Sequence, residues 1–323
     1  MNFSFTPEQE IVRAEARRFF GERVDVRAQI AMPGAHDPAL WKEMASLGLL
    51  GVAIPEALGG QGSSVLETCI VLEEAGRALL PGPFLPHTLA ALALARAGEN
   101  ADLAHSMAGG ETIAVATEDL AQVPCGAIAD IVAILRFQQS AVVRSFEAEE
   151  IESADLTRPL SRILPTAGEE PLGQVPLRPV ACVAVAAESV GTATAALESA
   201  TEYAKDRQQF GRPIGSFQAI KHKAADMLRA VEAARLAVYF AASAIDEGDR
   251  NAHVAAATAK VAANDALMRC AAENIQIHGG IGVTWEHDAH LYYRRALASS
   301  MMFGDSAGGR DLVARALFAG LDA

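Results

Sequence analysis

Residues 201–222 read Thr-Glu-Tyr-Ala-Lys-Asp-Arg-Gln-Gln-Phe-Gly-Arg-Pro-Ile-Gly-Ser-Phe-Gln-Ala-Ile-Lys-His, and they interrupt two long alanine-rich runs with helical periodicity. Gly211, Pro213 and Gly215 cannot all sit comfortably in one helix interior, because glycine costs backbone entropy and proline lacks an N–H donor. The sequence therefore predicts two helices joined by a short connector. Arg207 closes the first helix, where a cation suits the negative end of the helix dipole.

The connector carries polar groups suited to binding an anion. Arg207 and Arg212 each offer a planar fork of donors, which fits a phosphate or a carboxylate. Gln218 adds an amide edge at the start of the next helix. A second glycine-rich block follows the later helices, at Gln276-Ile-His-Gly-Gly-Ile-Gly-Val-Thr-Trp-Glu286. Glycines let backbone amides approach an anion closely.

These two blocks, in this order and at this spacing, resemble the two signatures of the FAD-dependent acyl-CoA dehydrogenases. The resemblance implies that the chain contacts an FAD held by a neighbouring subunit. The implied contact residues are Arg207, Phe210, Gln218, Gln276, Gly279 and Gly280. The alternative to an FAD contact is that Gly279 and Gly280 serve only as a helix C-cap.

The bulk composition fits a soluble globular protein of 323 residues, 51% of them hydrophobic. A net charge of −13 argues against nucleic acid or an anionic membrane surface as partners, because both normally require a basic patch. It does not exclude a phosphorylated ligand. Four widely spaced cysteines without a C-x-x-C pair favour a reducing compartment. No signal peptide and no apolar stretch of about 18–20 residues are evident, so we expect a cytoplasmic protein.

The pattern of elements predicts a mainly α chain with a small β domain, similar to an acyl-CoA dehydrogenase. We expect an N-terminal helical domain at 1–110, a reduced β domain at 111–178 and a C-terminal four-helix-bundle domain at 179–323. Strands are expected at 112–117, 128–135 and 140–143, and bundle helices at 180–206, 217–247, 251–277, 287–300 and 307–320. In the first domain, Glu73, Glu74 and Arg77 are interpreted as a solvated helix face with i,i+4 pairing.

The middle part departs from the family it resembles. It is shorter, and it lacks both the Thr-Glu-Pro-x-Ala-Gly-Ser-like stretch and the Trp-Ile-x-Asn-Gly-like strand that in the family hold the flavin ring of the subunit's own FAD. The closest remnant is Thr117-Glu118-Asp119.

The catalytic base expected in an acyl-CoA dehydrogenase is also missing. The reaction needs a carboxylate within hydrogen-bond reach of the α-proton of a thioester. In the commoner family pattern that position falls on Phe303 of this chain, and in the minority pattern it falls on Ala181. Asp305, two residues from Phe303, is a weak candidate for a displaced base, because misplacement by about 1 Å can cost about a hundredfold in rate.

Three readings remain open. The preferred one is the short, base-lacking subunit of a heterotetrameric (α2β2) acyl-CoA dehydrogenase of the steroid-degradation type. It would act with a homologous full-length chain, an acyl-CoA substrate, FAD and an electron-transfer acceptor. The alternatives are a self-sufficient homo-oligomer that uses Asp305, and a flavin-free structural homologue. No metal site is expected, because His287 and His290 lack a third suitably spaced ligand.

Overall fold

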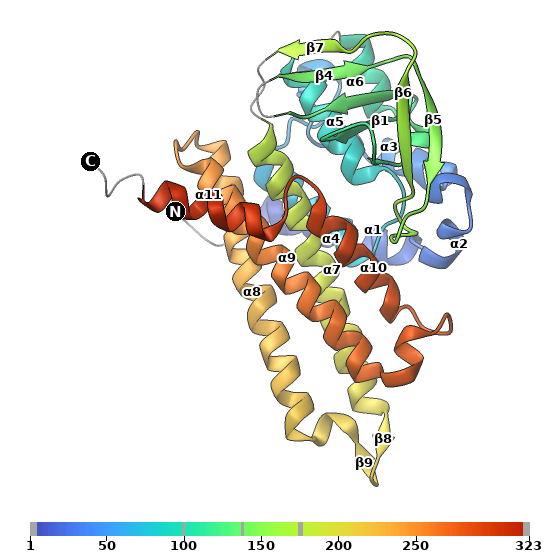
Figure 1. Ribbon diagram of the computed structural model, residues 1–323, viewed down its shortest axis with the longest axis vertical. Coiled ribbons are helices and arrows are strands. Elements are labelled where there is room, and N and C mark those ends of the chain that lie inside the picture. Colours follow the sequence, from blue (N-terminus) through green and yellow to red (C-terminus); the bar gives the residue numbers. More distant parts are fainter. Residues whose placement is uncertain (1–4, 99–100, 137–138, 174–176, 319–323) are drawn as a thin grey trace.

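The computed structural model describes residues 5–98, 101–136, 139–173 and 177–318 (Figure 1). Helices dominate the fold, with two small sheets inserted between an N-terminal helical part and a C-terminal bundle, so the predicted fold class is confirmed. The N-terminal helices are α1 (Pro7–Arg23), α2 (Val26–Ile30), α3 (Pro38–Ser46), α4 (Val65–Arg77), α5 (Phe84–Arg96) and α6 (Ala101–Ala108), with short 3-10 turns at Pro33–Ala35 and Glu56–Leu58.

Local sequence signals set the starts of two of these helices. The hydroxyl of Thr6 accepts the backbone N–H of Gln9 at 3.3 Å, and the Gln9 side chain accepts the N–H of Thr6 at 3.1 Å. Ser64 and Glu67 form the same reciprocal capping box at the start of α4. Each box satisfies two backbone donors that a helix start would otherwise leave unpaired.

The β part consists of a four-stranded and a three-stranded sheet. Its strands are β1 (Ala114–Thr117), β2 (Val123–Pro124), β3 (Ile131–Ile134), β4 (Ser140–Val143), β5 (Phe146–Ile151), β6 (Leu160–Pro165) and β7 (Glu170–Gly173). The four-stranded sheet has the order β1-β3-β4-β7, with β1 and β3 parallel, and the other sheet has the order β2-β6-β5. A 3-10 turn, Gly126–Ile128, separates β2 from β3.

Alternate residues of β1 serve two different cores. Val115 faces the cluster between the two sheets, whereas Ala114 and Ala116 join the main helical core on the side covered by α5. This follows from the two-residue repeat of a strand. The predicted strand at 140–143 matches β4, and the predicted strands at 112–117 and 128–135 each contain a shorter observed one.

The C-terminal part is an antiparallel bundle with a protruding hairpin. It contains α7 (Arg178–Asp206), β8 (Gln208–Gln209), β9 (Arg212–Pro213), the turn Ile214–Ser216, α8 (Gln218–Asp246), α9 (Ala252–His278), the turn Gly279–Val283, α10 (Ala289–Met301) and α11 (Ser306–Phe318). The predicted connector is thus a small antiparallel hairpin at the far end of the bundle (Figure 1). The predicted last helix extends to 320, and residues 319 and 320 lie outside the described part of the chain.

Helix α7 forms the centre of the molecule. It is the only helix in the described chain that is long and apolar enough to cross a membrane, and 89% of its most apolar window is buried inside the protein. It meets α4 backbone to backbone. A Cβ added at Gly191 would lie 1.8 Å from the carbonyl oxygen of Glu73, and one added at Gly76 would lie 2.0 Å from that of Glu188. Only glycine permits this approach.

The predicted solvated face of α4 is wrong. The carboxylates of Glu73 and Glu74 are buried, and each makes an ion pair with an arginine of another helix. Glu74 accepts two hydrogen bonds from Arg17 of α1, at 2.8 and 2.9 Å. Glu73 accepts from Arg235 at 2.9 Å and from the hydroxyl of Tyr239 at 2.6 Å, both on α8. The i,i+4 spacing within one helix could not predict these partners, because they come from other helices.

The boundaries of the three predicted domains stay a prediction. The described elements change type near them: α6 ends at Ala108 and β1 begins at Ala114, and β7 ends at Gly173 before α7 begins at Arg178.

Candidate functional site

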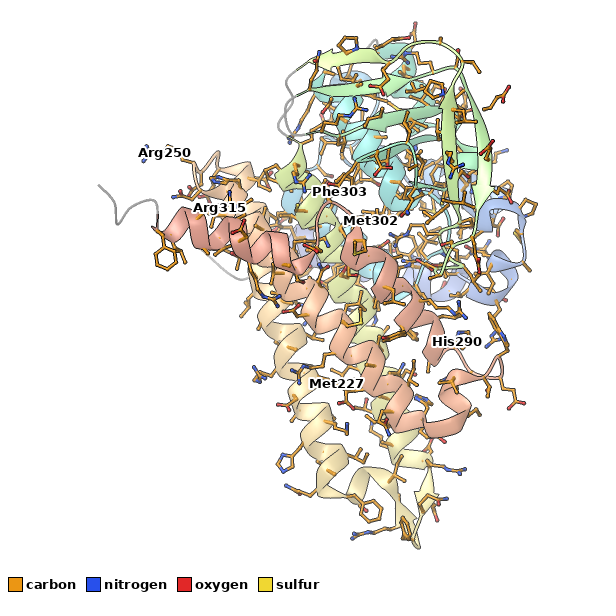
Figure 2. The ribbon with its side chains drawn as sticks, viewed as in Figure 1. Met227, Arg250, His290, Met302, Phe303 and Arg315 are labelled. Atoms are coloured by element: carbon orange, nitrogen blue, oxygen red, sulfur yellow. The ribbon has the colours of Figure 1, made fainter. Side chains whose placement is uncertain are left out.

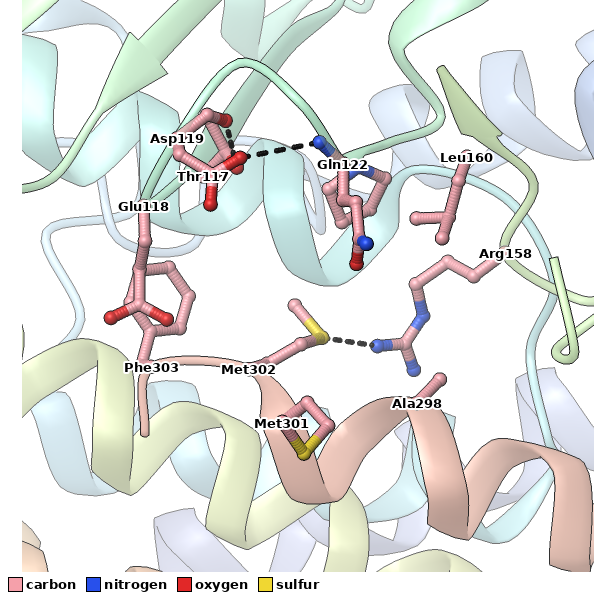
Figure 3. Close-up of a pocket in the computed structure, with 11 residues that line it drawn as sticks. Thr117, Glu118, Asp119, Gln122, Arg158, Leu160, Ala298, Met301, Met302 and Phe303 are labelled. Atoms are coloured by element: carbon pink, nitrogen blue, oxygen red, sulfur yellow. Dashed lines mark hydrogen bonds between the residues drawn. The ribbon is translucent and has the colours of Figure 1, made fainter. Parts of the chain in front are cut away.

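A pocket of about 190 Å³ lies where the β part meets the C-terminal end of α10 (Figures 2 and 3). It is lined by Thr117, Glu118, Asp119, Gln122, Pro124, Arg158, Leu160, Ala298, Met301, Met302 and Phe303. Two features singled out in the sequence therefore meet here: the Thr117-Glu118-Asp119 remnant and the commoner base position. Pockets that enclose a small organic ligand usually measure about 300–1,000 Å³, so this one is small.

Neither predicted base position carries an ionisable group, and both are closed to solvent. Phe303 is 3% exposed and Ala181 is 0% exposed. They lie close together, since the thiol of Cys182 contacts the carbonyl oxygen of Phe303 at 3.4 Å. Phe303 has a φ of 54°, in the left-handed region that a bulky residue rarely adopts. Phe303 therefore stands at the sequence position where the resemblance predicts the base, and its ring lines the pocket.

The side chain of Asp305 is engaged in capping a helix. Its Oδ1 accepts the backbone N–H of Gly308 at 2.8 Å, just before the start of α11. Asp305 is exposed and is not among the residues that line the pocket. This placement favours a capping role over proton transfer to or from a ligand in the pocket.

Buried polar groups hold the turn that carries Phe303. Lys260 of α9 donates to the carbonyl oxygen of Ser299 at 3.0 Å and to Oδ1 of Asn264 at 2.7 Å. Burial lowers the pKa of Lys260 to about 8 and raises the pKa of the Cys182 thiol. Lys260 thus satisfies a carbonyl in the last turn of α10, one turn before Met302.

A buried ionic cluster closes one side of the pocket. Arg158, from the loop between β5 and β6, donates to Glu188 of α7 at 2.5 Å and to the sulfur of Met302 at 3.0 Å (Figure 3). Arg295 of α10 donates to Asp155 at 2.9 Å and lies 3.3 Å from Glu188. Charges this deeply buried require partners. The cluster therefore ties the β part to the bundle and fixes the Arg158 side chain inside the pocket.

Sequence reasoning missed this cluster. Glu188 gave a usable signal, because it stands alone in the apolar run from Ala181 to Val190, and a carboxylate in such a run must find a buried partner. Its partners could not be inferred, since Asp155, Arg158 and Arg295 come from distant parts of the chain.

The residues predicted to contact FAD lie at the opposite end of the bundle. The side chains of Arg207, Phe210, Gln218 and Gln276 are exposed, as are Gly279 and Gly280. The end of α7, the start of α8 and the end of α9 meet at this end, next to the hairpin (Figure 1). Phe210 is 91% exposed, and Arg212 stacks over the ring of Phe217 at 4.2 Å.

Stacked rings join α7 to the glycine-rich turn. The ring of Tyr203 stacks on that of His278 at a centroid distance of 4.2 Å, and His278 lies 4.1 Å from the ring of His287. Arg207 follows Tyr203 by one helical turn, and Gly279 follows His278 directly. The two signature blocks are therefore adjacent in space. His290, the other histidine considered for a metal, packs against Trp285 at 4.6 Å.

The backbone of the glycine-rich turn is open to a ligand. Gly279 ends α9 with a φ of 67° and a ψ of −144°, which is open to glycine but lies outside the left-handed helical region of the usual glycine C-cap. In addition, a Cβ added at Gly279 or at Gly280 would meet no atom within 4 Å. Packing against the chain's own atoms therefore does not explain the absence of side chains at these two positions.

Two family domains match the chain. The acyl-CoA dehydrogenase N-terminal domain matches residues 6–107, and the acyl-CoA dehydrogenase C-terminal domain matches residues 180–318. The chain belongs to the acyl-CoA dehydrogenase family. The resemblance predicted from the two signature blocks is thereby confirmed, and with it the oxidoreductase class.

Two relatives from Mycobacterium tuberculosis (strain ATCC 25618 / H37Rv) are similar over most of this acyl-CoA dehydrogenase-family chain. Acyl-CoA dehydrogenase IpdE2 is 42% identical over 280 residues, which is 86% of either protein. Acyl-CoA dehydrogenase FadE34 is 36% identical over 286 residues, which is 81% of this chain but 40% of FadE34.

Two solved structures share the whole fold with the chain. The Tcur3481-Tcur3483 steroid ACAD G363A variant has a TM-score of 0.89 at 28% identity. The ChsE4-ChsE5 complex from Mycobacterium tuberculosis has a TM-score of 0.86 at 26% identity. In each case the match covers 98% of this chain and 99% of the other. The predicted similarity to two-chain members of the family is confirmed.

Proposed function

We propose that this chain is the base-lacking subunit of a heteromeric FAD-dependent acyl-CoA dehydrogenase. It completes an FAD site across the interface with a homologous full-length chain, which supplies the base and the flavin-ring pocket. The assembled enzyme introduces an α,β double bond into an acyl-CoA thioester and passes the electrons to a separate acceptor.

The separation between the two sets of site residues carries this proposal. Ala181 and Arg207 lie on the same helix, 26 positions apart, which corresponds to about 39 Å at about 1.5 Å per residue. The Arg207 end exposes groups that suit an anion, and neither predicted base position near the Ala181 end carries a carboxylate. Groups so far apart serve different sites, so the FAD contacts at Arg207 belong to a site completed by another chain.

The exposed end fits the phosphate-bearing part of FAD. Arg207 can pair with a pyrophosphate oxygen, and the backbone at Gly279 and Gly280 is open to close approach. When bound, FAD supplies the acceptor for the hydride that leaves the β-carbon of the substrate. This chain's part is to bind and orient the cofactor through Arg207, Gln218 and the glycine-rich turn.

The pocket at the other end does not fit a flavin ring together with a thioester. Its volume is only about 190 Å³, it is lined by Met302, Phe303 and Arg158, and Glu188 holds Arg158 in place. We therefore place neither group in this pocket.

The similar proteins support a two-chain arrangement and a bulky substrate. Two of the solved structures are named as pairs of chains, and one of these is called a steroid ACAD. FadE34 extends well beyond its match to this chain, which leaves room for a second unit within one polypeptide. On this basis the substrate is an acyl-CoA with a steroid side chain or ring remnant.

The second candidate function is a self-sufficient homo-oligomer that uses Asp305 as its base. The position of Asp305, two residues from Phe303, is the observation in its favour. It requires FAD and turnover in the chain alone.

The test is to purify the chain alone and together with a homologous full-length acyl-CoA dehydrogenase expressed from the same genome. We expect a colourless lone chain and a yellow heteromer with acyl-CoA dehydrogenase activity. Stoichiometric flavin in the lone chain would contradict the proposal. A heteromer that forms without flavin would instead indicate a structural homologue.

Within that heteromer, Arg207→Gln should weaken FAD binding about 10- to 100-fold, because a hydrogen bond to a charged group contributes about 1.5–3 kcal/mol. Arg250→Gln is the matched control. Arg250 is equally charged and exposed, but it lies in the loop between α8 and α9, at the other end of the bundle (Figure 2).

A further inference from the structure

The pocket beside Phe303 contains a buried donor with a poor acceptor. The side chain of Arg158 is 3% exposed, and its Nη1 donates to the thioether sulfur of Met302 at 3.0 Å (Figure 3). A thioether sulfur is a weak acceptor, and a buried donor without a good acceptor costs free energy. Arg158 is therefore positioned to donate to an oxygen atom of a ligand in this pocket.

Gln122 offers a second polar group to the same space. Its side chain extends into the pocket towards Arg158 and Met302 (Figure 3). The amide nitrogen of glutamine is a donor, and a carbonyl oxygen has two lone pairs that can each accept a hydrogen bond. Donors from two different loops thus suit one carbonyl oxygen between them.

The charge balance favours an uncharged ligand. Arg158 already pairs with Glu188 at 2.5 Å, and Arg295 pairs with Asp155 and Glu188, so two buried cations meet two buried carboxylates. A ligand carboxylate would add a negative charge without a partner, and such a charge is costly to bury. Asp119, which also lines the pocket, would repel it further.

The size and the remaining lining suit a single small ring. The pocket measures about 190 Å³. In a protein interior, an apolar cavity of about 150 Å³ is large enough to bind benzene. The other lining side chains that can contact a ring are Pro124, Leu160, Ala298, Met301, Met302 and Phe303. The flexible methionines can adapt to the shape of the ring.

We infer that this pocket binds an uncharged monocyclic ketone. The carbonyl oxygen replaces the sulfur of Met302 as the acceptor of Arg158 Nη1, and the ring contacts Met301, Met302 and Phe303. The site lies at the end of the bundle opposite to Arg207, so the inference does not rest on the proposed function.

The test is a titration of the full chain with cyclohexanone, followed by NMR of isotope-labelled methionine methyl groups. The signals of Met301 and Met302, assigned with Met301→Leu and Met302→Leu, should shift saturably. We expect a Kd of about 0.1–1 mM, since a ligand of so few atoms binds weakly. Met227 lies on α8, away from the pocket, and its signal should not move (Figure 2).

Two further compounds separate the parts of the inference. Cyclohexanecarboxylate tests the charge, and it should bind about tenfold or more weakly than the ketone, because the anion would lack a partner. Methylenecyclohexane tests the hydrogen bond, since a CH₂ group replaces the oxygen, and it should give no saturable shift up to its solubility limit.

Ala298→Trp should fill the pocket and weaken cyclohexanone binding about tenfold or more. Leu297→Trp is the matched control, because Leu297 is the preceding residue of α10, is 40% exposed and is not among the residues that line the pocket. It should leave the titration unchanged. The inference would be overturned by the absence of a saturable shift at Met301 and Met302, by equal binding of the carboxylate or the hydrocarbon, or by equal titrations of the two tryptophan variants.

Discussion

Ala181 and Arg207 stand at opposite ends of α7, separated by about 39 Å along the helix axis. The first lies beside the small pocket next to Phe303, and the second closes the helix at the exposed hairpin. One helix thus runs from a small pocket, where neither predicted base position carries a carboxylate, to an exposed surface suited to an anion. This relationship underlies the proposal that the chain completes the flavin site of another chain.

Asp305→Asn separates a capping role from a catalytic one. Asparagine caps a helix about as well as aspartate, but it cannot accept a proton as a carboxylate does. If Asp305 only caps α11, the heteromer should keep its turnover within about twofold, because no proton transfer is lost. The lone chain should keep its thermal midpoint, because asparagine preserves the cap. Steady-state assays and thermal unfolding measure the two effects.

Loss of turnover with retained FAD would instead support the homo-oligomer that uses Asp305. As a positive control for the cap, Asp305→Ala should lower the stability by about 1 kcal/mol.

Gly191→Ala should destabilise the chain by more than about 2 kcal/mol or prevent folding, because the new methyl group would meet the backbone of α4. Gly21→Ala is the matched control. Gly21 lies inside α1 with nothing near its would-be Cβ, so alanine there should stabilise the protein by about 0.5–1 kcal/mol. Urea unfolding of both variants gives the comparison. Equal effects of the two substitutions would contradict the close contact between α4 and α7.

Glu73→Ala should cost about 3–5 kcal/mol, because it leaves Arg235 partly buried without its main partner and removes the acceptor of Tyr239. Glu232→Ala removes the other carboxylate paired with Arg235. Because Glu232 is exposed, the expected loss is at most about 1 kcal/mol. Chemical denaturation should show this asymmetry, and similar losses from the two substitutions would place Glu73 at the surface.

Acid should destabilise the fold through His87. Burial lowers the pKa of His87 to about 4, against 6.5 for the unfolded residue. Between these values the unfolded chain binds more protons than the folded one, so stability falls as the pH is lowered from about 6.5 to about 4. The shift corresponds to a loss on the order of 3 kcal/mol.

His87→Gln cannot take up that proton, so the variant should lose less stability than wild type over the same pH range. Thermal midpoints at pH 7, 6, 5 and 4 provide the test, and parallel curves for the two proteins would exclude His87 as the cause.

Features set by neighbouring residues, such as helices and turns, could be predicted from the sequence. The helix periodicity and the glycine–proline break near Pro213 predicted the bundle and its connector within a few residues. Strands β5, β6 and β7 were not predicted. Most of β5 is exposed and rich in glutamate, and its pairing with β6 rather than its own composition makes it a strand.

Ion pairs between residues that are distant in the sequence could not be predicted either. Nothing near Glu73 in the sequence indicates Arg235, and nothing near Arg158 indicates Glu188. The positions of the missing base were found from the resemblance alone. That the two positions lie close together, beside a small pocket and far from Arg207, required the tertiary structure.

The most direct test of the account is the visible spectrum of the lone chain and of its mixture with the homologous full-length chain, with FAD in excess and unbound flavin removed. We predict no flavin band for the lone chain. The mixture should show a band near stoichiometric occupancy that Arg207→Gln weakens and Arg250→Gln does not. A stoichiometric flavin band in the lone chain, together with turnover of an acyl-CoA, would contradict the central claim.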